Sequence, residues 1–295
     1  MDFISDEKII HSMSSTNEPI AEVKPGETFV VKTRGPGIPD EVFEKDYSDG
    51  QYPQRILSIT GPIYIQDAEP GDVLEIAIND IEFDEEGKMW MGQWMGILMD
   101  EVQKPYLRKV KVKDGKAFFS EEITFPVRPM IGTLGVAPSE GEIACLYPGV
   151  HGGNMDVPSV APGNKLYLPV QVKGALLATG DVHAGMGDGE VFGTGIEIGS
   201  KVTMTVNVIK GKKLRHPMVE TPNSYEIIVS NEDLVEATKE ATREMISFLQ
   251  ERLKLTFEEA YALTGQVANL KFGQVVNPIY TISIEVSKSL LEGQQ

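Results

Sequence analysis

The chain is short of cysteine and of basic residues, and each shortage excludes a class of protein. A single cysteine, Cys145, among 295 residues rules out a disulfide framework and a zinc site built from several thiolates. Lysine and arginine number 27 against 44 aspartates and glutamates, so the net charge is −17. Phosphate backbones are repelled by such a surface, and the most basic segment, Lys210–His216, is short. No nucleic-acid partner is expected.

Two further absences concern location. The first residues, MDFISDEKIIHSM, are acidic and lack the basic start and apolar run of a secretory signal peptide. No stretch approaches the roughly 18 uninterrupted apolar residues of a membrane span. The sequence therefore predicts a cytoplasmic protein with no membrane partner.

What the chain does contain is a strong period-2 alternation of apolar and polar residues. Three segments show it well: Asp72–Phe83, Lys201–Lys210 and Ile279–Lys288. A Pro-Gly pair introduces several strands, as in KPGETFVV, EPGDVLEI and APGNKLYLPV. Proline fixes φ at the first central position of a type II turn, and glycine accepts the positive φ of the second. Many short strands with such turns predict a mainly β fold, a sandwich or a barrel.

One region breaks this rhythm near the C-terminus. The segment Asn231–Leu255 has helical spacing, and Ser230 or Asn231 is placed to cap its start. Thr256 opens a second helix, and Glu259 completes a capping box. We expect a helical hairpin, and one domain over 1–295 with a β-rich body (about 1–215) and an α+β portion (about 216–295).

The glycine-rich stretch Leu176–Gly199 is a candidate metal site. If two strands join at Gly187–Gly189, alternation places Asp181 and His183 on one face, with Glu197 diagonally beside Asp181. A histidine with two carboxylates suits a divalent metal, such as a catalytic zinc. The alternative is a turn with solvated carboxylates and no ion.

A second cluster, HGGNMD, spans His151–Asp156. Its paired glycines allow the backbone to approach a ligand closely, although a tight turn with self-bonded polar side chains explains them equally well. Other chemistries are poorly represented, because the chain has no G-x-S-x-G elbow and no P-loop. Cys145 in EIACLYPG has the pattern of a buried core residue.

Together these segments resemble the acetamidase/formamidase family of metal-dependent amide hydrolases. The resemblance rests on TGPIYIQDAEPGDVLEI, IGTLGVAPSEG, HGGNMD, GALLATGDVHAGMGDGEVFGTGIE and FEEAYALTGQVANLKFGQVVNP, and covers the chain from about Ile56 onward. It implies a jelly-roll-like β-sandwich with an α+β extension. It also implies hydrolysis of small aliphatic amides to carboxylate and ammonia, and assembly as a homodimer or larger homo-oligomer.

Roles for individual residues follow as hypotheses. The proposed metal ligands are Asp181, His183 and Glu197, with Asp156 as a fourth. Zinc is the preferred ion, and calcium is the alternative.

Glu190 is the candidate general base, although strict alternation places it on the opposite face unless the chain bulges at Gly187–Gly189. Asn154 and His151 are candidate hydrogen-bond donors to the substrate oxygen. Met186 stands where the family often has glutamine, so it is a candidate substrate-contacting position.

Two other functions remain open. One is hydrolysis of other amides or of lactams at the same site. The other is a non-catalytic ligand-binding β-sandwich with a structural calcium, against which His183 argues because hard cations prefer oxygen ligands.

Overall fold

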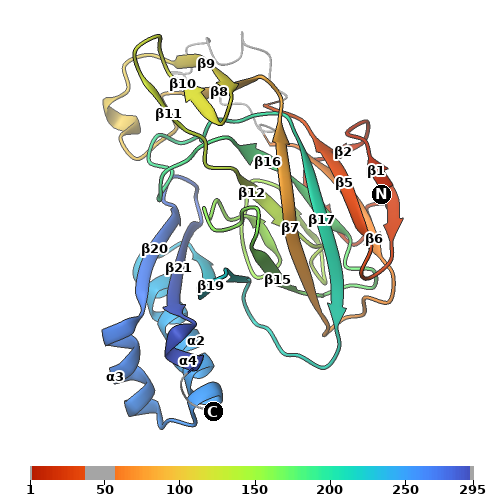
Figure 1. The fold of residues 1–295 in the computed structure, drawn as a ribbon, viewed down its shortest axis with the longest axis vertical. Helices are drawn as coiled ribbons and strands as arrows, with labels where there is room; N and C mark the ends of the chain where they lie inside the picture. The colour runs from red at the N-terminus through yellow and green to blue at the C-terminus, as the bar shows by residue number, and fades with distance from the viewer. Residues whose placement is uncertain (1, 37–56, 293–295) are drawn as a thin grey trace.

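The computed structural model describes residues 2–36 and 57–292, and it is dominated by β-strands (Figure 1). The strands are β1 (Asp2–Ile4), β2 (Ile9–Ile10), β3 (Ser12–Ser14), β4 (Ala21–Val23), β5 (Thr28–Thr33), β6 (Ile59–Ile65), β7 (Val73–Phe83), β8 (Glu86–Met91), β9 (Tyr106–Lys113), β10 (Lys116–Phe118), β11 (Thr124–Pro126), β12 (Met130–Gly135), β13 (Glu142–Ala144), β14 (Gly152–Asn154), β15 (Lys165–Pro169), β16 (Leu177–His183), β17 (Ser200–Ile209), β18 (Met218–Glu220), β19 (Ser224–Asn231), β20 (Asn269–Gln274) and β21 (Tyr280–Ser287). The helices are a 3-10 turn (Met99–Glu101), α2 (Leu234–Leu253), α3 (Phe257–Val267) and α4 (Ser289–Glu292).

Two large sheets form the body of the molecule. A nine-stranded sheet has the order β1-β5-β17-β7-β15-β18-β19-β21-β20, and a six-stranded sheet has the order β14-β12-β16-β6-β2 with β4 also paired to β6. Their inner faces share one apolar core, to which Ile76 and Val202 contribute from the first sheet and Ile63 and Leu134 from the second. Removal of these side chains from water is the main driving force that holds the two sheets together.

The expected alternation is present in this core. The segments predicted as strands form β7, β17 and β21, and in β17 the buried apolar side chains are Val202, Met204 and Val206. The glycines of the Pro-Gly turns, Gly26 and Gly71, have φ of 85° and 94°, as a type II turn requires. The mainly β prediction is therefore confirmed, while the jelly-roll connection stays a prediction.

The C-terminal portion continues the nine-stranded sheet and covers it with helices. In Figure 1, α2, α3 and α4 lie at the lower left beside β19, β20 and β21. Ala241, Met245 and Leu249 of α2 are buried against Ile282 and Ile284 of β21. The predicted helical hairpin is confirmed.

The caps of the two helices differ in how well the sequence predicted them. The capping box of Thr256 and Glu259 is present at α3, as expected. At α2 the expectation of Ser230 or Asn231 was wrong, because the helix begins later and Asp233 is the cap. Its Oδ1 accepts hydrogen bonds from Val235 N (2.8 Å) and from Glu236 N (3.0 Å), which satisfies two otherwise unpaired amides.

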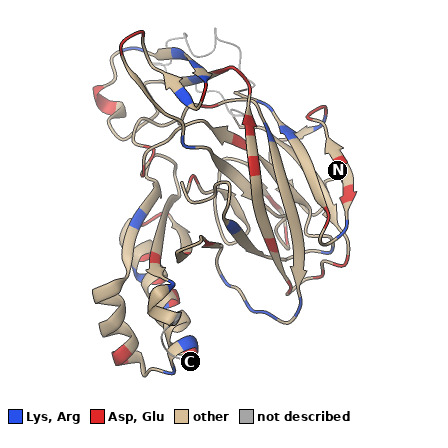
Figure 2. Cartoon of the chain, in the orientation of Figure 1, with Lys and Arg blue, Asp and Glu red and all other residues tan. Residues whose placement is uncertain are grey.

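Lysine and arginine occupy separate parts of the surface rather than one patch. Figure 2 shows one group on β9 and β10 at the top of the view and another in the loop after β17 at the bottom. None of the helices in the described residues is both long enough and apolar enough to span a membrane.

Candidate metal centre

The centre is built on β16, whose last residues carry two polar side chains. Strand β16 lies between β12 and β6, and at its end His183 pairs with Met130 of β12. Asp181 has a φ of 56°, in the left-handed region that is uncommon for residues other than glycine. This local departure from regular strand geometry accompanies a side chain that turns towards His183, whose imidazole is fully buried.

Glu197 reaches the same point from a loop that two strands hold in place. Its backbone N–H donates to Lys88 O of β8 and its carbonyl accepts from Lys88 N, both at 2.8 Å. On its other side it forms an isolated antiparallel bridge with His183. The predicted hairpin register, which placed Glu197 opposite Thr179, was therefore wrong, and the segment after Gly187–Gly189 is a loop with isolated bridges rather than a strand.

Two further carboxylates enter from loops with unusual backbone conformations. Asp156 follows β14 with a φ of 49°, and Glu190 follows the Gly187–Gly189 turn with a φ of 47°. The chain leaves strand geometry at this turn, so Glu190 faces the same cluster as His183 despite its place in the alternation. Strained conformations of this kind cost about 1–3 kcal/mol each and are concentrated at functional sites.

Two glycines leave the space that these side chains occupy. A Cβ on Gly132 would lie 2.7 Å from Asp181 Oδ2 and closer still to Asp156 Oδ1. A Cβ on Gly195 would lie 2.6 Å from His183 Nδ1. Larger residues at either position would displace a candidate ligand.

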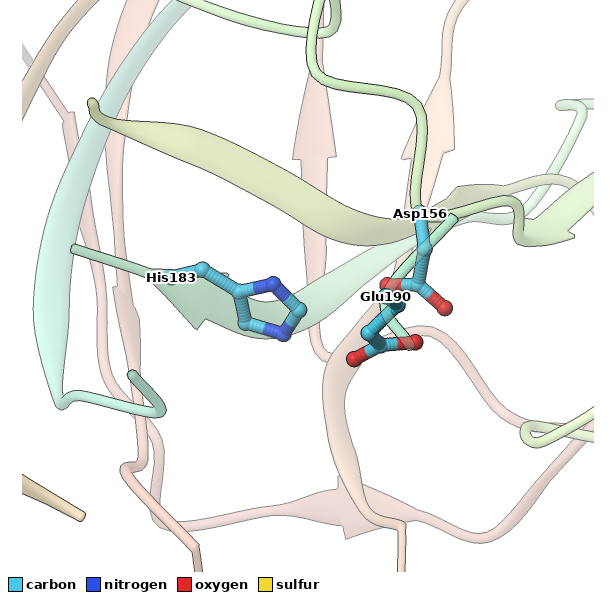
Figure 3. Close-up of side chains that lie close together, drawn as sticks. All are labelled: Asp156, His183 and Glu190. Carbon is cyan, nitrogen blue, oxygen red and sulfur yellow. The ribbon is translucent and has the colours of Figure 1, made fainter. Parts of the chain in front are cut away.

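The side chains converge without forming the hydrogen bonds that such proximity would normally give. His183 Nε2 lies 2.9 Å from Glu197 Oε1 and 3.5 Å from Asp181 Oδ1. Yet neither ring nitrogen has a hydrogen-bond partner among the described residues, and Asp156 Oδ1 has none either. Ligand atoms of Asp156, His183 and Glu190 lie within 4.8 Å of one another, and so do those of Asp181, His183 and Glu197. Figure 3 shows the imidazole directed towards the paired carboxylates of Asp156 and Glu190.

Charge in this acidic cluster (Asp156, Asp181, His183, Glu190 and Glu197) is poorly compensated by protein groups. Burial and the charge of Asp181 raise the pKa of Glu197 to about 8. Burial also raises the pKa of Glu190 to about 8, and the charges of Glu197 and Asp181 add to this effect. Burial alone would lower the pKa of His183, but the neighbouring carboxylates raise it well above its ordinary value. A bound cation would relieve this crowding of negative charge.

A threonine that the sequence did not reveal supports the cluster. Thr133 of β12 places its hydroxyl 3.0 Å from Asp181 Oδ2 and 2.8 Å from the side-chain oxygen of Asn154. It therefore orients a candidate ligand and the neighbouring amide together. Residues of this kind commonly tune metal affinity through the ligands that they hold. In the sequence Thr133 stands out only as part of the IGTLG segment. The residues with which a strand pairs cannot be read from that strand alone.

The cluster opens into a pocket of about 470 Å³. Asn154 and the four carboxylates line it, together with apolar side chains such as Trp90, Trp94 and Ile97. His151 and Met186 are both buried but are not among the lining residues. The His151 ring instead packs beside Gly149 and Gly153, within its own tight turn. The other six predicted site residues thus belong to the acidic cluster or to the pocket lining, and His151 and Met186 belong to neither.

The sequence of the chain matches the model of the acetamidase/formamidase family over residues 14–147 and 143–287. The chain belongs to this family. A crystal structure described as a predicted acetamidase/formamidase from Thermoanaerobacter tengcongensis is 38% identical, with a TM-score of 0.92 over 99% of this chain and 97% of that one. An acetamidase from Bacillus halodurans is 35% identical, with a TM-score of 0.93 over 99% of both chains.

The curated relatives are matched over only part of their length. A formamidase from Methylophilus methylotrophus is 25% identical over 257 residues, which cover 65% of this chain and 61% of that protein. A putative formamidase from Schizosaccharomyces pombe is 28% identical over 218 residues. The chain spans about half of that protein's length, 52%. Family membership thus agrees with the resemblance identified from HGGNMD and the Gly174–Glu197 segment.

Proposed function

We propose that the protein is a metal-dependent hydrolase that cleaves the C–N bond of small aliphatic amides, of the formamide or acetamide type, to give a carboxylate and ammonia. Family membership and the names of its relatives support the reaction class. The observation that carries metal dependence is the approach of two carboxylate oxygens to His183 Nε2 with no hydrogen bond between them. This arrangement supports the proposal that these atoms share a bound ion.

The donor set fits a divalent cation. Asp181, His183 and Glu197 would hold it, with Asp156 as a fourth ligand. An imidazole nitrogen favours zinc over calcium or magnesium, which prefer oxygen ligands alone. When bound, such an ion polarises the amide carbonyl and lowers the pKa of water towards about 7.

Glu190 is proposed as the general base. Its carboxylate takes a proton from water as the water oxygen bonds to the carbonyl carbon, and then delivers that proton to the amide nitrogen. The C–N bond breaks, ammonia departs, and the acyl group leaves as a carboxylate. Asn154, whose side-chain oxygen contacts the Thr133 hydroxyl, lines the same pocket and is our candidate hydrogen-bond donor to the substrate amide. Because His151 and Met186 do not line the pocket, we assign them no substrate contact.

Ammonia release from formamide, acetamide and propionamide, with metal content assayed in parallel, tests this proposal. Turnover should disappear with a chelator and return with zinc. His183→Ala should lose both metal and activity while it retains the β-rich circular dichroism spectrum of the wild type. An inactive, metal-free wild-type protein would contradict the proposal.

One observation favours a second candidate, a calcium-containing ligand-binding protein. The cluster has four carboxylates and only one imidazole, and calcium prefers such oxygen ligands. Tight calcium binding without release of ammonia from any amide would support this candidate over hydrolysis.

A further inference from the structure

The pocket above the acidic cluster is much larger than acetamide. Its volume is about 470 Å³. A water molecule occupies about 30 Å³ in the liquid, and acetamide is only a few atoms larger. Pockets of roughly 300–1,000 Å³ are typical of sites that bury ligands of drug size.

The wall of this pocket is divided by chemistry. The carboxylates and Asn154 form a polar group of neighbours, whereas much of the remaining lining is apolar: Trp90, Trp94, Met95, Ile97, Leu146 and Val275. Ile97 is 54% exposed, so an apolar group that covers it would remove apolar surface from water. An amide group bound at the acidic cluster would direct its acyl group onto this apolar wall.

We infer that the preferred substrates are uncharged amides whose acyl group is apolar and several carbons longer than acetyl, such as hexanamide. This inference rests on the proposed amide hydrolysis and names the substrate class of that same site. Each methylene that moves from water onto the apolar wall strengthens binding by roughly fourfold. The same apolar wall disfavours an acyl group that carries a charge, because burial of a charge against apolar side chains costs free energy unless a partner compensates it.

Kinetics over a homologous series tests this inference. With zinc-loaded protein, kcat/KM from ammonia release should rise from acetamide through butanamide to hexanamide, by more than tenfold overall. A kcat/KM that falls beyond acetamide would overturn the inference while the proposed function stands.

Tryptophan fluorescence gives a readout that does not require turnover. The chain has only two tryptophans, Trp90 and Trp94, and both line the pocket. Hexanamide should change their emission at a concentration more than tenfold below that required for acetamide. Tighter binding of hexanamide without release of ammonia from any amide would contradict the proposed function but support the inference about the pocket. Equal or weaker binding of hexanamide would overturn the inference.

Two neighbouring residues supply a matched pair of variants. Ile97 lines the pocket, whereas Leu98, 60% exposed on the same segment, does not. Ile97→Ala should lower the ratio of hexanamide to acetamide kcat/KM by at least about fourfold, and Leu98→Ala should leave that ratio unchanged. Equal effects of the two variants would contradict a specific role of the pocket wall.

Discussion

Two clusters of carboxylates in the described part of the chain have their charge compensated in different ways. On the nine-stranded sheet lies a lysine-balanced cluster of Glu75, Tyr167, Glu220, Lys165 and Lys288. Lys165 Nζ is 3.2 Å from Glu75, and Lys288 Nζ is 2.6 Å from Glu220. Partial burial opposes ionisation there, but hydrogen bonds from the lysines and from Tyr167 hold the pKa values of both glutamates below their ordinary range.

The acidic cluster shows the opposite result. There the neighbours of Glu190 and Glu197 are mainly other carboxylates, and burial raises the pKa of each to about 8. His183 is the only cationic side chain within the cluster. The sheet cluster thus carries its own cations, whereas the acidic cluster is expected to take one from solution under the proposed function. The expected consequences can be tested in order of size.

Metal removal should produce the largest difference between the two clusters. Chelation should reduce amide hydrolysis to background and lower the melting temperature, because an ion at a thousandfold excess over its Kd adds about 4 kcal/mol to the free energy of unfolding. Activity assays and calorimetry with and without chelator measure both effects. A Lys288→Met protein should show the same chelator-induced change in melting temperature, because Lys288 pairs with Glu220 in the lysine-balanced cluster. A melting temperature unaffected by chelation would refute the distinction.

Removal of the proposed base should be nearly as damaging to catalysis but should leave the ion in place. Glu190→Gln keeps the shape of the side chain and eliminates its proton transfer, so kcat should fall by about 10²–10⁴. Metal content by mass spectrometry should stay at the wild-type level. Asp188→Asn, an exposed change in the same turn, is the matched control and should retain full activity. Loss of the metal in Glu190→Gln would instead make Glu190 a ligand.

The hydroxyl that orients Asp181 should have an intermediate effect. Thr133→Val preserves the volume and removes the hydroxyl that lies within hydrogen-bond distance of both Asp181 and Asn154. Metal affinity or activity should fall by about 10–100-fold. Isothermal titration with zinc measures the first and ammonia release the second. Thr205→Val on β17, whose hydroxyl bonds Thr28, is the control and should change neither. Equal zinc affinities for Thr133→Val and wild type would remove Thr133 from the site.

Sequence patterning predicted the strands of the nine-stranded sheet better than it predicted the acidic cluster, and the reason is physical. On β7, β17 and β21 the side-chain face follows directly from the two-residue backbone period, so alternation was sufficient. The acidic cluster depends on left-handed backbone at Asp156 and Glu190, which breaks that period. Alternation therefore placed Glu190 on the wrong face unless the chain bulged.

The chemistry of the residues was enough to predict candidate metal ligands, whereas the pairing of distant strands could not be predicted. The combination of Asp181, His183 and Glu197 was recognisable from ligand chemistry, although the pairing partner of Glu197 was wrong. Thr133 could not be found, because its role depends on how β12 pairs with β16, and a single sequence does not specify that register. Met186 was chosen from its place in a motif, and its burial away from the pocket lining was not visible in that motif.

The lysine-balanced cluster should respond least, and only in stability. Lys288→Met retains the apolar stem and removes the ion pair with Glu220, so the free energy of unfolding should fall by about 1 kcal/mol or less, because both partners are partly exposed to solvent. The folded-state pKa of Glu220 lies below its unfolded value of about 4.3, so the stabilisation is complete above that value. It is lost as the pH falls through the folded-state pKa. Urea denaturation should therefore separate the two proteins at neutral pH and show them converging in acid, with amide hydrolysis equal in both. A difference that persists in acid would mean that Lys288 stabilises the fold through another contact of its ammonium group, such as the Tyr225 ring 5.0 Å away, and the charge comparison between the two clusters would then fail at this residue.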